Sequence, residues 1–193
     1  MPPSELKTKA SKLQKRIDSR RRQGLVLILA GILFISFSFY WRHLRARILS
    51  FDNYTPEETK NEGVSAANIK IPSVGIDLPV EKGQIVKGVW QISEKGASQL
   101  DKSANPGHKG NTVIYGHNKN SLFGPIRWLK EGDSIEITDE NRTLYTYRVV
   151  KTVITTPDDI EYVLPKSEEI LTLYTCTGLL DSKRHIVLAK REN

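Results

Sequence analysis

The sequence predicts an all-β domain, built as an antiparallel sandwich or a closed barrel, preceded by an N-terminal transmembrane helix. Two observations support this fold class. A run of uncharged, largely apolar residues spans 25–41, and short β-rich runs separated by turn residues fill the chain from residue 69 onwards. At 193 residues the chain is long enough for one such domain together with additional segments.

The N-terminal segment has the composition of a membrane anchor. Residues 25–41 carry no charge, and at about 1.5 Å per residue they span roughly 25 Å, near the lower limit for a transmembrane helix. Eight Lys and Arg residues precede this run and three follow it closely. The positive-inside rule therefore predicts a cytosolic basic tail, 1–24, and an extracytoplasmic C-terminal part. The alternative is a cleaved signal peptide, but such peptides usually end in small residues, whereas this run ends in Phe39-Tyr40-Trp41.

The positive charge of the chain belongs to this membrane flank. The formal net charge is +7, but residues 1–50 alone carry +9 and the other 143 residues carry −2. A polyanion binder gains its affinity by neutralising phosphates. A slightly acidic domain is poorly suited to that, so we expect no nucleic-acid partner and instead expect a single-pass protein of the cell membrane.

The region after the anchor divides into a linker and a β-rich domain. Residues 42–67 are polar and contain Pro56 and Gly63, which predicts a linker with a short helix near Pro56. Two short helical patches are expected at 90–96 and 122–129. The expected strands are 68–71, 76–80, 112–116, 134–137, 144–154, 170–176 and 184–189.

The chain contains one cysteine, Cys176, so no intramolecular disulfide is possible. A free thiol outside the cytosol is exposed to oxidation, which leaves two interpretations: a buried, inert side chain or a working nucleophile. Strand alternation places Cys176 on the same face as Tyr174 and opposite Thr175. Cys176 also ends its strand directly before a loop, where a thiol has rigid support and access to solvent.

Two further residues at strand ends could act with this thiol. His117 ends the run TVIYGHN, and Arg184 begins RHIVLAK after a seven-residue loop from Cys176. An imidazole can exchange a proton with a thiol or an amine, and a guanidinium can stabilise an oxyanion. A separation of 59 residues between His117 and Cys176 does not establish contact. His108 is expected to be a solvated loop residue, and His185 to face away from Arg184.

Five segments, taken in order, carry a family resemblance. They are IKIPSVGIDLPVEKG, NPGHKGNTVIYGHN, SLFGPIRWLKEGDSIEI, LTLYTC and KRHIVLAK. Together they resemble the opening strands, histidine segment, helix and turn, cysteine signature and arginine strand of the sortase family. The resemblance covers roughly two thirds of the chain and is specific in combination, although each segment alone would be weak.

The resemblance implies an eight-stranded sortase-type β-barrel over residues 68–193. It implies cleavage of a C-terminal sorting signal of the Leu-Pro-x-Thr-Gly kind between Thr and Gly. Cys176 would form the thioester, His117 would be the acid/base and Arg184 the electrostatic partner. Thr175 would either add a hydrogen bond to the substrate or only pack. The acyl group would pass to an amine acceptor such as a peptidoglycan precursor, with no cofactor. Segments 76–80 and 153–164 would line the groove for the Leu-Pro end.

Departures from the family pattern bear on the subclass. Tyr115 and Asn118 stand where many sortases carry Ala and Arg around the histidine. The sequence has no second membrane segment after Ala189, which argues against a pilus-polymerising type.

Other functions remain open at this point. Some family members bind calcium, and the acidic residues Glu161, Glu168 and Glu169 lie in a plausible loop, but solvated loop charge is the favoured reading and no metal site is predicted. An L,D-transpeptidase also uses Cys and His, yet that family has Ser-x-Gly-Cys where this chain has Leu-Tyr-Thr-Cys. A catalytically silent, membrane-anchored binding domain is the alternative from another class.

Overall fold

The computed structural model describes residues 20–40, 50–51, 62–86 and 88–192. The chain divides into two compact units, Met1–Leu44 and Arg45–Asn193. The short helix predicted near Pro56 lies outside the described residues.

The first unit contains the predicted helix, which spans Arg20–Tyr40. Its 21 residues rise about 30 Å, which matches the hydrocarbon thickness of a bilayer. Large apolar side chains such as Leu27 and Phe34 are exposed along it. By length and composition this helix is apolar enough to cross a membrane. It begins ahead of the apolar run because Arg and Gln are good helix formers.

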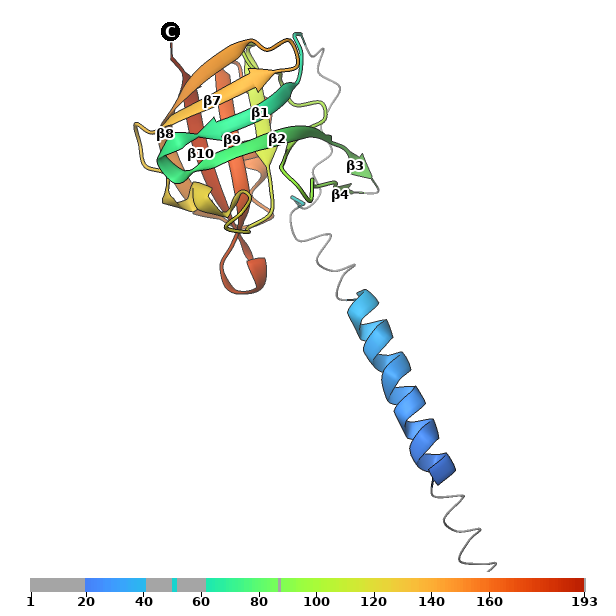
Figure 1. Ribbon diagram of the computed structural model, residues 1–193. Helices are drawn as coiled ribbons and strands as arrows, with labels where there is room; N and C mark the ends of the chain where they lie inside the picture. Colours follow the sequence, from blue (N-terminus) through green and yellow to red (C-terminus); the bar gives the residue numbers. More distant parts are fainter. Residues whose placement is uncertain (1–19, 41–49, 52–61, 87, 193) are drawn as a thin grey trace, which may run out of the picture. The chain divides into compact units, whose positions relative to one another are not determined.

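The second unit is built on a closed barrel of eight strands, as the resemblance implied (Figure 1). The order around the wall is β1-β2-β5-β6-β9-β10-β8-β7, and β3 pairs with β4 outside it. The barrel strands are β1 (Ala66–Ile71), β2 (Ile76–Gly83), β5 (Ala97–Leu100), β6 (Gly110–Tyr115), β7 (Ser134–Asp139), β8 (Leu144–Thr155), β9 (Glu169–Thr177) and β10 (Lys183–Arg191).

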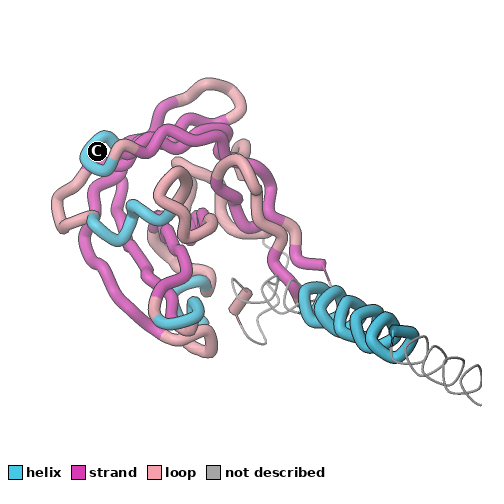
Figure 2. Tube along the Cα trace, turned by 60° about the horizontal axis from the view of Figure 1, so that its bottom comes forward, coloured by secondary structure: helices cyan, strands magenta, loops and turns pink. Residues whose placement is uncertain are grey.

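Of the two architectures expected, the closed barrel is the one that forms, and two of its strand pairings are parallel rather than antiparallel. β2 runs parallel to β5, and β6 runs parallel to β9. Parallel neighbours need a long crossover. The chain between β6 and β9 provides this crossover, because it contains β7 and β8. The strands curve round to close the wall (Figure 2).

The shorter elements also differ from the sequence prediction. The helix expected at 90–96 is absent. Trp90 belongs instead to β4 (Val89–Trp90), which pairs with β3 (Ile85–Val86). The residues after it form a turn, in which Ser93 Oγ accepts hydrogen bonds from the N–H groups of Lys95 and Gly96. In 122–129 only the 3₁₀ turn η2 (Gly124–Trp128) forms. The sequence analysis missed β5, whose residues ASQL are buried despite two polar side chains. The other turns are η1 (Pro72–Val74), η3 (Ile160–Val163) and η4 (Leu179–Asp181).

Two apolar clusters lie on the two faces of the barrel wall. The inner cluster draws on all the barrel strands, and on β9 it contains Leu171 and Leu173. The outer cluster lies against β5, β6, β9 and β10, and on β9 it contains Tyr174 and Cys176. The predicted alternation of β9 is therefore confirmed. Ile76 and Val80, expected to line a groove, belong instead to the inner cluster.

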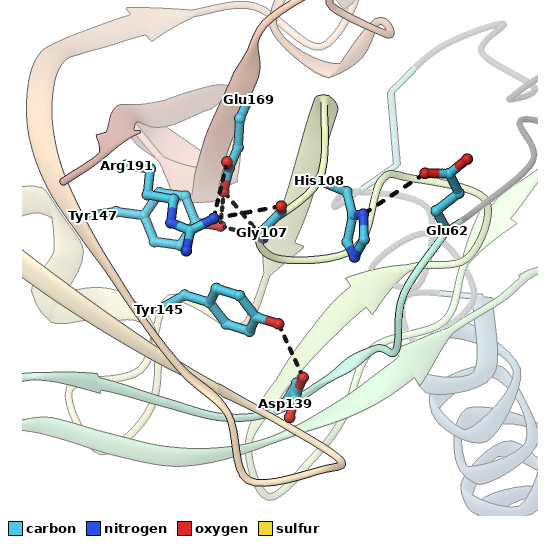
Figure 3. A network of polar contacts seen from close by, with 8 residues as sticks. All are labelled: Glu62, Gly107, His108, Asp139, Tyr145, Tyr147, Glu169 and Arg191. Atoms are coloured by element: carbon cyan, nitrogen blue, oxygen red, sulfur yellow. Dashed lines mark hydrogen bonds and ion pairs between the residues drawn. The ribbon is translucent and has the colours of Figure 1, made fainter. Parts of the chain in front are cut away.

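A polar network holds the loop before β6 to the neighbouring strands (Figure 3). The buried Tyr147 hydroxyl donates to Glu169 Oε1 at 2.8 Å, and the Gly107 N–H contacts both groups at 3.0 Å. Gly107 has φ +80° and lies so close to Tyr145 that a Cβ would be 2.2 Å from the ring, so only glycine fits. Arg191 Nη1 lies 3.5 Å from Glu169 Oε2. This network fixes the end of the barrel where β9 begins.

Candidate active site

The three predicted site residues lie at one level of three neighbouring strands. In the parallel β6–β9 pair, Tyr115 is opposite Tyr174, and His117 and Cys176 each follow two residues later. In the antiparallel β9–β10 pair, Arg184 is the direct partner of Cys176. Adjacent strands lie about 4.8 Å apart. The fold thus brings together residues that are 59 and eight positions apart along the chain.

Cys176 lies on the outer face of the wall under a cover of aromatic side chains. Its exposed fraction is 3%, and it belongs to the same cluster as Tyr115 and Tyr174, whose rings stack with centroids 5.3 Å apart. Burial raises the pKa of the Cys176 thiol to about 12, against the opposing effect of the Arg184 guanidinium. The resting thiol is therefore protonated at neutral pH.

His117 is held by its backbone at the end of β6. Its carbonyl accepts hydrogen bonds from the N–H groups of Lys119 at 2.8 Å and Phe123 at 3.2 Å. Gly116 precedes it where a Cβ would lie 2.8 Å from Phe123 Cβ, so the chain passes too closely for a side chain. The imidazole is about one quarter exposed, and its Nε2 lies 3.4 Å from Glu94 Oε1. Its position therefore comes from backbone bonds and close packing.

Arg184 is almost fully buried and bonds to backbone carbonyls. Its Nη1 donates to the oxygens of Asp181 and Lys183 at 3.1 Å each, and its Nη2 donates to Ser50 O at 3.0 Å. These acceptors belong to η4, to the first residue of β10 and to the segment before the barrel. Leu180 and Asp181 have φ of +53° and +59°, a left-handed conformation that is costly for such residues. The Arg184 bond to Asp181 O helps to hold that loop.

The pair Ser50–Phe51 covers the outer face beside Arg184. Phe51 is 2% exposed, packs edge-on against Tyr174 at 5.1 Å and lies beneath the Arg184 guanidinium, 5.9 Å from Cζ to the ring centroid. Ser50 Oγ accepts a hydrogen bond from the Trp90 N–H at 3.0 Å. The sequence analysis placed both residues in the linker. The one sequence feature that could have indicated their burial is the large apolar side chain of Phe51 at the start of a polar stretch.

Thr175 lies on the other face of β9 and bonds within the protein. It is fully buried, and its Oγ1 donates to Gly116 O at 2.8 Å. This bond ties the end of β9 to the end of β6, immediately before His117. A direct substrate contact of Thr175 stays a prediction.

His108 and His185 do not belong to this row. His108 Nδ1 lies 4.0 Å from Glu62 Oε2, in the loop before β6. His185 is 8% exposed, and burial lowers its pKa, with Arg127 adding to the effect. His108 and Glu62 line a cavity of about 650 Å³ whose walls are the β5–β6 and β8–β9 loops. The cavity lies near the start of β9, and seven residues of strand, about 23 Å, separate that start from Cys176.

Two of the three acidic residues considered for calcium, Glu168 and Glu169, have partners within the protein. Glu168 Oε2 accepts a hydrogen bond from Lys190 Nζ at 2.9 Å, and Glu169 belongs to the network with Tyr147 and Arg191. Within the described ranges of the chain, no group of three or more His, Cys, Asp or Glu residues is arranged to hold a metal ion.

The β8–β9 loop reaches the outer face of the wall. Val153, Ile160, Tyr162 and Val163 pack in the cluster that contains Cys176. The buried side chain of Asn111 holds the loop, because its Nδ2 donates to Tyr162 O at 2.9 Å and to Leu164 O at 3.0 Å. Segment 153–164 therefore adjoins the candidate site, and its expected part in lining a groove for the Leu-Pro end stays a prediction.

The protonation of Cys176 gives a direct prediction. Because its pKa is about 12, the thiolate fraction should grow about tenfold per pH unit. We expect the rate of alkylation of the full chain by iodoacetamide to rise steadily from pH 7 to 10 without a plateau, followed by intact-mass spectrometry. The chain has one cysteine, so the label has one site. In urea, the alkylation rate of the same chain should level off near pH 9. A plateau of the rate at that pH in the folded protein would contradict a buried thiol.

Comparison with known proteins places this geometry in a family. The sortase domain model matches residues 69–192. Sortase A of Bacillus anthracis is 38% identical over 123 residues, covering 62% of this chain and 56% of that protein. Sortase A of Listeria monocytogenes is 32% identical over 124 residues, covering 62% and 53%. The match thus spans little more than half the length of these curated relatives.

Solved structures agree with this assignment. The structure of sortase A from Corynebacterium diphtheriae superposes with a TM-score of 0.58 at 32% identity, covering 68% of this chain and 61% of that chain. A sortase D transpeptidase of Clostridium perfringens gives a TM-score of 0.58 at 28% identity, covering 70% and 83%. The barrel, the matched domain and these relatives agree: the chain belongs to the sortase family of cysteine transpeptidases.

Proposed function

We propose that this chain cleaves a C-terminal sorting signal of the Leu-Pro-x-Thr-Gly kind between Thr and Gly and transfers the acyl part to an amine. The observation that carries the proposal is the row of His117, Cys176 and Arg184 across β6, β9 and β10. A thiol, an imidazole and a guanidinium side by side supply a nucleophile, a proton carrier and an oxyanion donor.

The first half-reaction forms the thioester. The Cys176 thiol is protonated at rest, so His117 accepts its proton as the sulfur attacks the threonine carbonyl carbon. The S–C bond forms and the carbonyl becomes a tetrahedral oxyanion. When the C–N bond to glycine breaks, His117 returns the proton to the departing amine.

Arg184 is suited to hold the oxyanion. In the structure its guanidinium already donates to three backbone carbonyl oxygens, those of Ser50, Asp181 and Lys183. A peptide substrate also presents a carbonyl oxygen to Arg184. In the tetrahedral state this oxygen carries a negative charge, which strengthens its hydrogen bond to the guanidinium. One well-placed donor of this kind contributes roughly 3 kcal/mol.

The second half-reaction resolves the thioester. An amine, such as that of a peptidoglycan precursor, attacks the thioester carbon while His117 accepts its proton. The new amide C–N bond forms, the C–S bond breaks, and the proton returns to Cys176. The aromatic and aliphatic cover of the outer face keeps water from competing at this step.

The helix supports a location on the membrane. We infer that residues 25–41 anchor the chain in the lipid bilayer as a single-pass signal anchor, with the basic tail 1–24 in the cytosol. Residues 42–67 would link the anchor to the catalytic domain 68–193 outside the membrane. The substrates would then be surface proteins that carry sorting signals. The apolar helix Arg20–Tyr40 and the excess of Lys and Arg before it support this orientation.

The cleavage reaction is tested by removing the nucleophile. We expect the full chain in detergent micelles to cleave Leu-Pro-x-Thr-Gly peptides and to form an acyl-enzyme visible by mass spectrometry. Cys176→Ala should form none, while its thermal unfolding stays close to that of the wild type because Ala loses little volume.

A matched pair of histidine variants controls this experiment. His117→Ala should lose cleavage, whereas His108→Ala, at the other end of β6, should retain it. Cleavage by Cys176→Ala would show that the nucleophile is another residue. A wild-type chain that forms no acyl-enzyme with any peptide would favour the silent binding domain.

Arg184→Lys separates charge from geometry. Lysine keeps the charge but lacks the planar set of donors, so we expect kcat/KM to fall about a hundredfold, mostly in kcat. The free energy of unfolding should fall by about 1–3 kcal/mol, because the bonds to Ser50 O and Asp181 O are weakened. Kinetics measured well below the Tm separate the two effects. Exposed Arg148→Lys should change neither, and near-wild-type turnover of Arg184→Lys would leave Arg184 a structural role.

Membrane topology is tested with a reporter. An alkaline phosphatase fused after Asn193 should be active outside the cytosol, and the mature chain should retain residues 25–41 on mass analysis. A soluble product that starts near residue 42 would replace the anchor with a cleaved signal peptide.

A further inference from the structure

Glu94, in the loop between β4 and β5, lies between the side chains of His117 and Lys119. Glu94 Oε1 lies 3.4 Å from His117 Nε2, and Glu94 Oε2 lies 3.3 Å from Lys119 Nζ. The carboxylate thus contacts the imidazole on one side and an ammonium on the other. His117 and Lys119 both hold the pKa of Glu94 below its usual value, with the His117 charge acting most strongly.

The loop that carries Glu94 is rigidly placed. Ser93, immediately before it, is buried, and its N–H donates to Ser98 Oγ at 2.8 Å. Gly96, two residues after it, packs so closely on β2 that a Cβ would lie 2.2 Å from Pro79 O. Although the Glu94 side chain is largely exposed, its backbone is fixed on both sides. The carboxylate therefore starts from a defined point beside His117.

The Nε2 nitrogen of the His117 ring lies beside the Glu94 carboxylate. It is shielded from solvent, and its 3.4 Å approach to Glu94 Oε1 is a close contact rather than a hydrogen bond. A buried ring N–H needs an acceptor, whereas a bare ring nitrogen opposite a carboxylate would bring two acceptors together. The proton of the neutral ring therefore belongs on Nε2, and the contact made by one ring nitrogen sets the state of the other.

We propose that Glu94 is a positioning residue that keeps the His117 proton on Nε2 and leaves Nδ1 to exchange protons with Cys176 and the amine groups of the substrates. This inference rests on the proposed function, because it refines the part played by His117. When Nδ1 accepts the thiol proton, the ring becomes an imidazolium, and the carboxylate stabilises that charge.

The size of the effect follows from exposure. Glu94 and Lys119 are largely solvated, so their interactions are screened by salt and remain small. We expect a change in kcat/KM of about three- to fivefold at low salt, and less at high salt. Other charged or titratable groups at this end of the barrel, among the described residues, include Tyr174 and Cys176 on β9, Lys183, Arg184 and His185 on β10, Asp181 in η4 and Arg127 in η2.

The tautomer can be measured without any turnover. In the full chain labelled with ¹⁵N-histidine in detergent micelles, two-bond ¹H–¹⁵N correlations identify which ring nitrogen carries the proton. His117→Gln assigns the His117 signals among the four histidines. We expect the neutral wild-type ring to carry its proton on Nε2 and Glu94→Ala to lose that preference. Glu140→Gln is the matched control, because Glu140 pairs with Lys82 at 4.0 Å away from any histidine.

Kinetics supply the second readout. Glu94→Gln should lower kcat/KM about three- to fivefold at low salt and less at high salt, while Glu140→Gln leaves it unchanged. A wild-type proton on Nδ1, or a Glu94→Ala spectrum identical to the wild type, would overturn the proposal. The spectra could behave as expected while His117→Ala still cleaves peptide. In that case the proposed reaction fails, and the role of Glu94 in catalysis fails with it. The effect of Glu94 on the His117 ring would still stand.

Discussion

The parallel pairing of β6 with β9 is the constraint on which the site depends. Parallel strands end at the same edge of a sheet, so His117 and Cys176 leave the wall side by side. An antiparallel pairing would have put them at opposite ends of the barrel. The Thr175 bond to Gly116 O and the close passage of Gly116 against Phe123 fix this junction. The crossover that makes it possible is the β7–β8 hairpin, so that hairpin shapes the site without contributing a side chain to the row.

The parts of the site that are local in sequence could be predicted from it. Cys176 and Arg184 end and begin adjacent antiparallel strands across a seven-residue loop, so their pairing follows from a hairpin. The alternation of β9 was also readable, because successive side chains of a strand point to opposite faces, which separates Leu171 and Leu173 from Thr172. The placement of His117 next to this pair depends on a crossover, and only the order of the family motifs pointed to it.

The parts that were missed depend on long-range contacts. Phe51 lies in a polar stretch and becomes buried only because Trp90 and Tyr174 form a surface for it. Ser50 is 134 residues from the arginine that it contacts. β5 reads as polar, yet Ser98 and Gln99 are buried because each bonds to a neighbouring segment. No periodicity in a short window carries such information, since burial in these cases is decided by partners elsewhere in the chain.

The two faces of the wall separate stability from chemistry. The inner face of β9 is apolar and closely packed, so changes there act through cavities and the free energy of unfolding. The outer face carries the thiol and the guanidinium under a cover made of loops and of Ser50–Phe51. Burial on that face keeps the Cys176 thiol protonated, which protects the lone thiol from oxidation but also withholds the nucleophile. The reaction proposed above therefore requires a proton acceptor next to the sulfur and a substrate carbonyl for Arg184, and a barrel whose strand ends meet at one edge has room for both.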